Sequence, residues 1–457
     1  MRVLHVLANS PPDTNGYAIR SHMLAKHQNK LEDIEVFAIS SPFYPQKDSM
    51  VENFEIDGIE YSRCVHPVRR ERNSKISHKL IKKNTRIREK SNQENTVQEK
   101  KNPLKSMFDF CYYGVFKLGR LIKKPLSLAY KVWEERILMK LFQSELEDYI
   151  IAKNIDVIHA HTPYRVGIPA QKAAKKTGKK FVYEVRGIWE ETAVANGRWK
   201  RNGLAYSRFR RFENRILKST ERIISISKEL EKELISRGIP KNRITVVPNG
   251  IELHKEEEKS FRYDEILSKM KSLEGELTVG YIGSLRHLEG VDLTARAVSN
   301  LVKDGNSLNF FCLTGLDGQQ ELSNLCDRLG LSQRSLITGP VPHKEVGSFY
   351  DLIDIFVVSR PDYPVTRIIT PLKPFEAMIR ARPVVVTNLP ALTEIVEHLE
   401  TGLVTETVSV ESLEESIIKL VNDKSLRKRI GENAKSWVAE NRNWDRLAEK
   451  SALVYQK

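Results

Sequence analysis

Residues 354–397 read DIFVVSRPDYPVTRIITPLKPFEAMIRARPVVVTNLPALTEIVE, and the fold class can be predicted from this stretch. The apolar runs Ile355 to Ser359 and Pro383 to Thr387 are typical of strands buried in a parallel sheet. Between them we expect a long loop interrupted by proline and a helix that begins near Pro374. Because open parallel sheets bind ligands outside the carboxyl ends of their strands, the stretch predicts a doubly wound α/β sheet with a site beside this helix.

The residue types around the predicted helix start fit a sugar nucleotide. Pro371 and Pro374 stiffen the approach to the helix, so the free N–H groups of its first turn can point at an anion. Lys373 adds a positive charge for a diphosphate. Glu376 can accept two hydrogen bonds from a ribose diol. The alternative is that both are ordinary charges on a solvated first turn.

The segment TPLKPFEAM, followed by RPVVVTN and LTEIV, resembles the nucleotide-binding segment of retaining glycosyltransferases of family 4. The usual form of that motif is a Glu, seven residues, then Glu-Ala-Met; its second Glu binds the ribose and its first contacts the donor sugar. Glu376 matches the second Glu, but Ile368 stands in place of the first. The Thr-Pro-Leu-Lys-Pro signature is similar to that of a subgroup that includes exosortase-associated enzymes. The resemblance implies that Thr370, Leu372, Lys373 and Glu376 bind the donor.

A second donor-binding segment follows the strand predicted at 277–283, LTVGYIG. The family usually has Gly-Arg and then Lys-Gly here, and the two cations clamp the donor diphosphate. In this chain Ser284 and Glu289 occupy those places. The resemblance therefore implies that Lys373 is the main partner of the diphosphate, helped by Arg286, Arg367 and Ser284. The loop 338–342 resembles the segment that flanks the nucleobase.

The N-terminal strand, Val3 to Ala8, runs through a turn into a predicted helix. Gly16 would let the backbone approach a ligand closely. In the family this junction touches donor phosphate and acceptor, which implies acceptor-side roles for Tyr17 and Arg20. The alternative is a junction that only connects a strand to a helix.

A histidine ends the strand predicted at 156–161. His161 matches the family histidine near the reacting carbon, so the resemblance implies that His161 and Lys373 are catalytic. The stretch EVRGIWEETAV resembles the same subgroup and implies that Arg186 pairs with phosphate or acceptor charge, while Glu190 and Glu191 bind acceptor hydroxyls. The alternatives are a structural histidine and a salt-bridged helix start.

Length and composition limit the number of domains and the classes of protein that are possible. A chain of 457 residues, 40% of them hydrophobic, is long enough for two cores. Its four cysteines have no C-x-x-C spacing, which argues against zinc and a disulfide framework and favours a reducing cytoplasm. No apolar run suggests a signal peptide or a membrane span. We expect an acceptor-side domain at 1–250, a nucleotide-sugar domain at 251–435 and a closing helix at 436–457.

A basic insertion is expected at 67–131. This segment contains 18 Lys and Arg residues but only 5 Asp and Glu residues. Its second part interleaves aromatic and basic residues, as does a helix lying at an anionic membrane surface. The alternative is a solvated loop followed by a helix that packs on the core. The sequence contains no recognisable nucleic-acid-binding fold, so we expect no nucleic-acid partner.

Together these features predict two Rossmann-like domains facing a cleft, the B-type glycosyltransferase fold. The resemblance implies retaining transfer of a sugar from a nucleotide-diphosphate donor to a saccharide or polyprenyl-linked acceptor, without metal or other cofactor. We expect a cytoplasmic protein, peripheral at the inner face of the plasma membrane. The alternatives are a sugar-nucleotide epimerase of the same architecture and a membrane-surface binding protein with a degenerate site.

Overall fold

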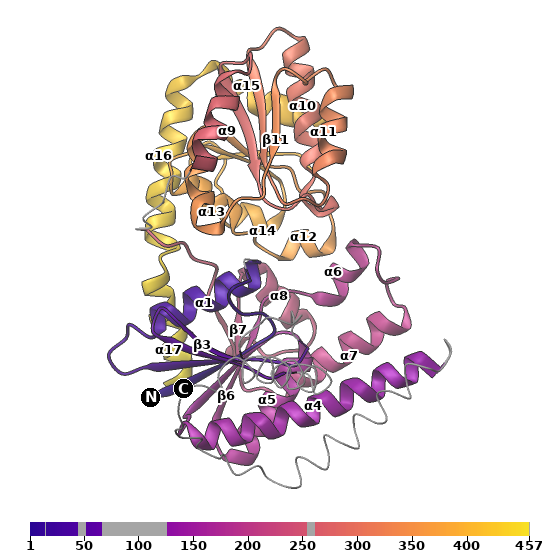
Figure 1. Cartoon of the computed structure of the whole chain (residues 1–457), viewed down its shortest axis with the longest axis vertical. Coiled ribbons are helices and arrows are strands. Elements are labelled where there is room, and N and C mark those ends of the chain that lie inside the picture. Colours follow the sequence, from indigo (N-terminus) through magenta and orange to yellow (C-terminus); the bar gives the residue numbers. More distant parts are fainter. Residues whose placement is uncertain (14, 44–51, 66–125, 254–260, 457) are drawn as a thin grey trace, which may run out of the picture. The chain divides into compact units, whose positions relative to one another are not determined.

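A computed structural model describes residues 1–13, 15–43, 52–65, 126–253 and 261–456 (Figure 1). Most of the predicted insertion at 67–131 lies outside the described residues. The chain forms two compact units, one of residues 1–10 and 32–181 and one of residues 11–31 and 182–457. Each unit is built on parallel strands.

The first unit contains five strands in the order β3-β4-β2-β1-β5. They are β1 Arg2–Leu7, β2 Glu35–Ser40, β3 Asn53–Ile56, β4 Ile59–Arg63 and β5 Val157–His161. All pairs are parallel except β3 with β4, which is antiparallel. Val3, Leu4 and Val6 of β1 are fully buried, as expected for a continuous apolar strand inside such a sheet. Helices α4 (Leu126–Ala152) and α5 (Tyr164–Thr177) pack against each other.

The second unit contains a six-stranded, all-parallel sheet in the order β11-β10-β9-β12-β13-β14. Its strands are β9 Leu277–Ile282, β10 Leu308–Leu313, β11 Ser335–Thr338, β12 Ile355–Val358, β13 Val384–Thr387 and β14 Leu403–Thr405. The unit also holds most of β6 (Lys180–Val185), together with β7 (Arg222–Ser225) and β8 (Ile244–Val246), paired in parallel in that order.

The helices of the second unit lie between or after these strands in the chain, except α1, which precedes them. They are α1 Gly16–Gln28, α6 Trp189–Ala195, α7 Leu204–Ser219, α8 Lys228–Ser236, α9 Phe261–Lys271, α10 Val291–Lys303, α11 Gln319–Arg328, α12 Pro364–Ile368, α13 Lys373–Met378, α14 Pro390–Thr393, α15 Val410–Asn422, α16 Lys424–Asn441 and α17 Trp444–Gln456. The 3₁₀ segments are η1 Lys241–Arg243, η2 His287–Glu289 and η3 His343–Leu352. Figure 1 shows α12, α13 and α14 gathered at one end of the six-stranded sheet.

The strands predicted from apolar runs are confirmed within a residue or two at most ends, and two local features differ. One is β3, which was not predicted because it is a short edge strand whose residues alternate between exposed and half-buried. The other is the expected loop before Pro374, which contains the short helix α12. Pro364 is preset for a first helical turn, and the hydroxyl of Thr366 accepts a hydrogen bond from the Tyr363 N–H at 2.8 Å.

The last helix, α17, packs against α1 within the second unit. The amide of Gln28 donates to Ser451 at 2.9 Å and to Tyr455 at 2.8 Å, and His27 lies 2.5 Å from Asp445. The domain boundaries predicted at residues 250 and 435 stay a prediction. Across the described ranges, no helix combines the length and apolar character needed to cross a lipid bilayer.

Candidate functional site

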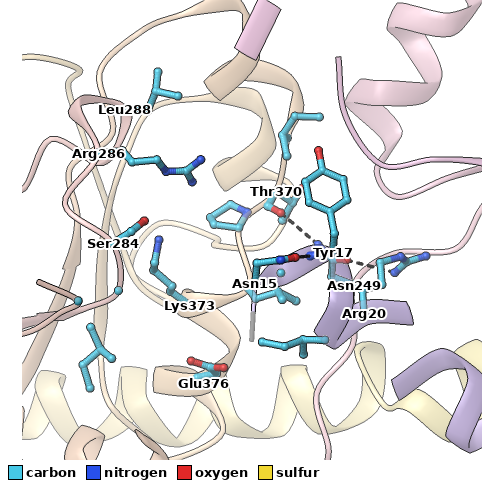
Figure 2. A pocket seen from close by; sticks show the side chains of 18 of the residues that line it. Asn15, Tyr17, Arg20, Asn249, Ser284, Arg286, Leu288, Thr370, Lys373 and Glu376 are labelled. Carbon is cyan, nitrogen blue, oxygen red and sulfur yellow. Dashed lines mark hydrogen bonds between the residues drawn. The ribbon is translucent and has the colours of Figure 1, made fainter. Parts of the chain in front are cut away.

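The second unit contains an open hollow of about 620 Å³ at the carboxyl ends of its strands. The residues that line it come from α1, from the loops after β6, β7, β8, β9, β10, β11 and β12, and from α12 and α13. Figure 2 shows Ser284, Arg286 and Lys373 along one side of this hollow and Asn15, Tyr17 and Asn249 along another. Its position agrees with the ligand crevice expected for an open parallel sheet.

Lys373, the first residue of α13, lines the hollow with a side chain that is 18% exposed. Its ammonium lies 3.0 Å from Oε2 of Glu289 and 5.2 Å from the ring centroid of Tyr281. Burial lowers the pKa of Lys373, and Arg360 and Arg286 lower it further, while Glu289 opposes them. Glu289 is therefore the neighbour that favours the charged form of Lys373.

Glu289 is fully buried and its carboxylate contacts three cations. Arg360 donates to both of its oxygens, at 3.2 and 3.1 Å, and Arg286 donates to Oε1 at 3.1 Å. Burial alone would raise the pKa of Glu289, but Arg360 and Lys373 hold it well below its usual range. The carboxylate is thus ionised among three cations, all of which line the hollow.

The loop that carries Glu289 has no room for side chains at its two glycines. Gly283 has a φ of +147°, and a Cβ there would lie 2.1 Å from Cε of Lys373. Gly290 has a φ of +65°, and a Cβ there would lie 1.9 Å from the carbonyl oxygen of Ser359. Glycine is needed at Gly290 both for this conformation and for the close backbone approach.

Glu376 lies one helical turn after Lys373 and also lines the hollow. The hydroxyl of Tyr350 donates to its Oε2 at 2.5 Å. Burial raises the pKa of Tyr350, and the neighbouring Glu376 raises it further, so the phenol stays protonated as a donor. Tyr350 therefore fixes the Glu376 carboxylate at the edge of the hollow.

The other side of the hollow is built on α1. Asn15 caps this helix by accepting hydrogen bonds from the N–H groups of Tyr17 and Ala18 at 3.1 and 3.0 Å. Gly16 lines the hollow, and a Cβ there would make only ordinary contact, 3.7 Å from Leu372. Burial raises the pKa of Tyr17 although Arg186 and Arg286 lower it, which keeps its hydroxyl protonated.

The two arginines on this side are held by protein groups. Arg20 donates to Glu184, to the carbonyls of Val247 and Pro248, and to Asn249, at 2.7 to 3.1 Å. Arg186 donates to Glu184, to the Tyr17 carbonyl at 2.8 Å and to Ser21 at 2.6 Å. Both residues line the hollow, but their hydrogen bonds chiefly fix α1 to β6 and the loop after β8.

The loop expected to flank a nucleobase also reaches the hollow. Pro340, Val341 and His343 line it, together with Thr314 and Gly315 after β10. This edge is formed by the loops after β10 and β11 and by the start of η3. Such a surface suits the flat face of a base.

Three predicted site residues of the second unit do not line the hollow. Arg367 forms a bidentate pair with Asp362, with both distances 2.5 Å. Glu190 is buried and accepts from Arg237 at 2.9 Å. Glu191 accepts from the Tyr206 hydroxyl at 2.7 Å and from Arg201. All three residues form ion pairs in the structure. For Glu190 and Glu191 this agrees with the alternative of a salt-bridged helix start.

His161 belongs to the first unit, where it ends β5 in a buried cluster with His5 and His159. Nδ1 of His5 lies 3.0 Å from Nε2 of His161. One ligand atom from each residue lies within 4.8 Å of the others. The His161 ring is nearly parallel to both neighbours, at 19° and 27°. The rings of His5 and His159 are inclined to each other by 44°. Three buried imidazoles with ligand atoms this close together are a candidate metal-binding group.

Sequence reasoning missed Arg360, which the structure places beside Lys373 and Arg286 at the hollow. A signal was present, since Arg360 follows the buried strand β12 at its carboxyl end, where ligand-binding residues gather. Of the predicted donor residues, Ser284, Arg286, Thr370, Leu372, Lys373 and Glu376 all line the same hollow.

Two family models match the sequence. Residues 263–437 match Glycosyl transferases group 1, and residues 117–255 match Glycosyltransferase Family 4. An uncharacterized glycosyltransferase of Methanocaldococcus jannaschii is 25% identical over 51% of this chain, which covers 59% of that relative. The capsular polysaccharide biosynthesis glycosyltransferase CapM of Staphylococcus aureus is 26% identical over 62% of this chain and 71% of its own length. The glycosyltransferase assignment is thus supported by both segments.

The structure also resembles solved structures over its whole length. Anabaena Alr3699/HepE in complex with UDP-glucose is 14% identical, with a TM-score of 0.63 over 100% of this chain and 99% of that one. At this identity the likeness shows the fold alone. The predicted fold class, two parallel-sheet α/β domains of the B-type glycosyltransferase fold, is confirmed.

Proposed function

We propose, from the glycosyltransferase segments and the B-type fold, that this protein is a retaining glycosyltransferase. It moves a sugar from a nucleotide-diphosphate donor to a saccharide or polyprenyl-linked acceptor in cell-surface polysaccharide or glycoconjugate assembly. The observation that carries the proposal is the hollow where Lys373, Arg286 and Arg360 surround the single carboxylate of Glu289. An excess of positive charge at the carboxyl ends of a parallel sheet suits a diphosphate.

The donor fits the hollow in one orientation. The diphosphate lies against Lys373 and Arg286, near the Ser284 hydroxyl and the Thr370 and Leu372 backbone. Glu376, oriented by Tyr350, accepts hydrogen bonds from the ribose. The base lies against the loops at Val341 and Thr314. Anabaena Alr3699/HepE, which has the same fold, was solved with UDP-glucose bound, and this supports a donor of the same class.

The chemistry we propose is electrostatic. Cations fixed before the reaction stabilise the negative charge that develops on the departing diphosphate, so no metal is required. The hydroxyl of the acceptor attacks the anomeric carbon from the side that the diphosphate leaves, and a donor phosphate oxygen takes its proton. Tyr17 and Arg186, which line the hollow, face the acceptor. The catalytic role of His161 stays a prediction from the family resemblance.

The remaining assignments are further proposals. The Thr-Pro-Leu-Lys-Pro signature, residues 370–374, supports membership of the exosortase-associated subgroup, whose donor contacts do not use a first motif Glu. We propose a cytoplasmic location at the inner membrane face, with the insertion at 67–131 binding anionic lipid. Cosedimentation of the full chain with anionic and neutral vesicles tests this location, since equal recovery with both would contradict it.

A donor panel tests the function. Thermal shift of the full chain with UDP-, GDP-, ADP- and CMP-sugars should show stabilisation by one nucleotide class, because a ligand that binds only the folded state raises its melting temperature. A labelled sugar from that donor should then appear in a glycoside with its anomeric configuration retained. An epimerase would leave only the altered donor sugar. Failure of every donor to bind would reject the proposal.

A further inference from the structure

We propose that Glu289 is a positioning residue for the donor diphosphate: a buried carboxylate that holds Lys373, Arg360 and Arg286 in place as a preassembled cationic wall. The inference rests on the proposed function, because it concerns the same hollow. It adds that the acidic residue found where the family usually has a lysine does not contact the ligand. Its role is to orient the cations that do.

The placement of the carboxylate supports an indirect role. Glu289 has 0% exposure, and it is not among the residues that line the hollow, whereas its three cationic partners are. The carboxylate therefore lies behind the cations, and a ligand in the hollow meets the cations first. The three cations lie between Glu289 and a phosphate in the hollow, so attraction by three charges opposes repulsion by one.

The hydrogen bonds fix both charge and direction. Arg360 is bidentate to Glu289, the arrangement that constrains a guanidinium most. Lys373 and Arg286 each contact one oxygen, at 3.0 and 3.1 Å. Three cations against one carboxylate leave a net charge of about +2, which suits a bound diphosphate. Without the carboxylate, three cations would face one another in a partly buried site, which is unfavourable.

The backbone prevents the carboxylate from moving away. The hydroxyl of Ser359 donates to the Gly290 carbonyl at 2.7 Å and lies 2.8 Å from that of Thr294. A Cβ at Gly290 would lie within 1.9 Å of the Ser359 backbone, so the two segments meet without a side chain between them. This contact fixes η2 against the end of β12, which also carries Arg360.

The positioning role of Glu289 predicts a pH dependence of nucleotide binding, because Glu289 influences the charge of Lys373. The groups that face its ammonium are Glu289 on η2, Arg360 after β12, Arg286 after β9, Tyr281 on β9 and Cys312 on β10. Burial raises the pKa of the Tyr281 hydroxyl and of the Cys312 thiol, so both are neutral. Glu289 is therefore the group that raises the pKa of Lys373 against burial and the two arginines. Neutralising Glu289 lowers the pKa of Lys373. The Lys373 ammonium then loses its charge as the pH rises.

The test measures the affinity of the full chain for UDP, GDP and ADP by calorimetry between pH 6.5 and 9.5. Wild type is expected to bind one nucleotide with little change over this range. Glu289→Gln keeps the size of the side chain and removes its charge. We expect it to weaken binding about tenfold or more at pH 9.5 relative to pH 6.5, as Lys373 loses its proton.

A second substitution separates positioning from folding. Arginine stays protonated throughout this range, so Lys373→Arg combined with Glu289→Gln should remove the new pH dependence while binding remains weaker than in wild type. Asp362→Asn removes a carboxylate from another arginine pair that does not line the hollow, and its affinity and pH profile should equal those of wild type.

The outcomes separate the proposed glycosyltransferase function from the positioning role of Glu289. If wild type binds none of the nucleotides, the proposed function fails. If wild type binds one and Glu289→Gln binds it with the same affinity and pH profile, the function stands and the positioning role is wrong. If Glu289→Gln does not fold, Glu289→Asp keeps the charge and shortens its reach. It should weaken binding equally at every pH, and unchanged affinity in Glu289→Asp would overturn the inference.

Discussion

Two of the buried glutamates in the second unit differ in what they face. Glu289 is bound by three cations that line an open hollow. Glu190, on α6, pairs with Arg237, which also pairs with Glu233, and neither member of that pair lines the hollow. Positive charge exceeds negative charge around Glu289, whereas two carboxylates share one arginine at Glu190. A buried ion pair alone therefore does not indicate a site, and the proposed donor site rests on the excess of cations at the hollow.

Glu190→Ala should give the largest effect, and on stability alone. Removing one member of a buried pair leaves Arg237 partly uncompensated and costs about 3 kcal/mol of unfolding free energy. Denaturant titration measures this loss. Calorimetry at a temperature where the variant is folded should show unchanged nucleotide affinity, and weakened affinity would show that the two groups are not separate in function.

Lys373→Met should give the largest effect on catalysis. Methionine keeps the aliphatic length and removes the charge, so we expect kcat/KM to fall about 10²- to 10³-fold, as when one preorganised electrostatic group is lost. Steady-state rates with the donor found in the panel measure the change. A loss below about threefold would mean that Arg286 and Arg360 alone hold the diphosphate.

Glu376→Ala should have an intermediate effect on donor affinity. Loss of a charged hydrogen bond to the ribose weakens binding by about 1.5 to 3 kcal/mol. Calorimetry with the nucleotide measures it, and Tyr350→Phe should produce a smaller loss because the carboxylate remains and only its orienting donor is removed. Unchanged affinity in Glu376→Ala would exclude this residue from the site.

Arg367→Ala should have the smallest effect. Its partner Asp362 is close to the surface, and an exposed pair of this kind contributes about 0.2 to 1 kcal/mol. Nucleotide affinity should equal that of wild type, because Arg367 does not line the hollow. A tenfold loss would restore the donor-binding role that was predicted for this residue from the sequence.

Most of the fold and one wall of the site could be predicted from the sequence. Runs such as 277–283 and 355–359 are apolar at nearly every position because strands of an internal parallel sheet are covered on both faces. The segment 370–376 carries its ligand-binding residues close together on one loop and one helical turn, so Lys373 and Glu376 could be assigned locally. The same local pattern could not separate Arg360 from Arg367, which lie seven residues apart on the same segment.

Which charges meet depends on tertiary packing. Glu289 and Lys373 are 84 residues apart in the chain, and they come within 3.0 Å because β9 and β12 are neighbours in the sheet. Glu190 and Glu191, by contrast, are turned toward Arg237 and toward Arg201 and Tyr206. Burial patterns are local and can be read along the chain, whereas the partner of a charge depends on how distant segments pack.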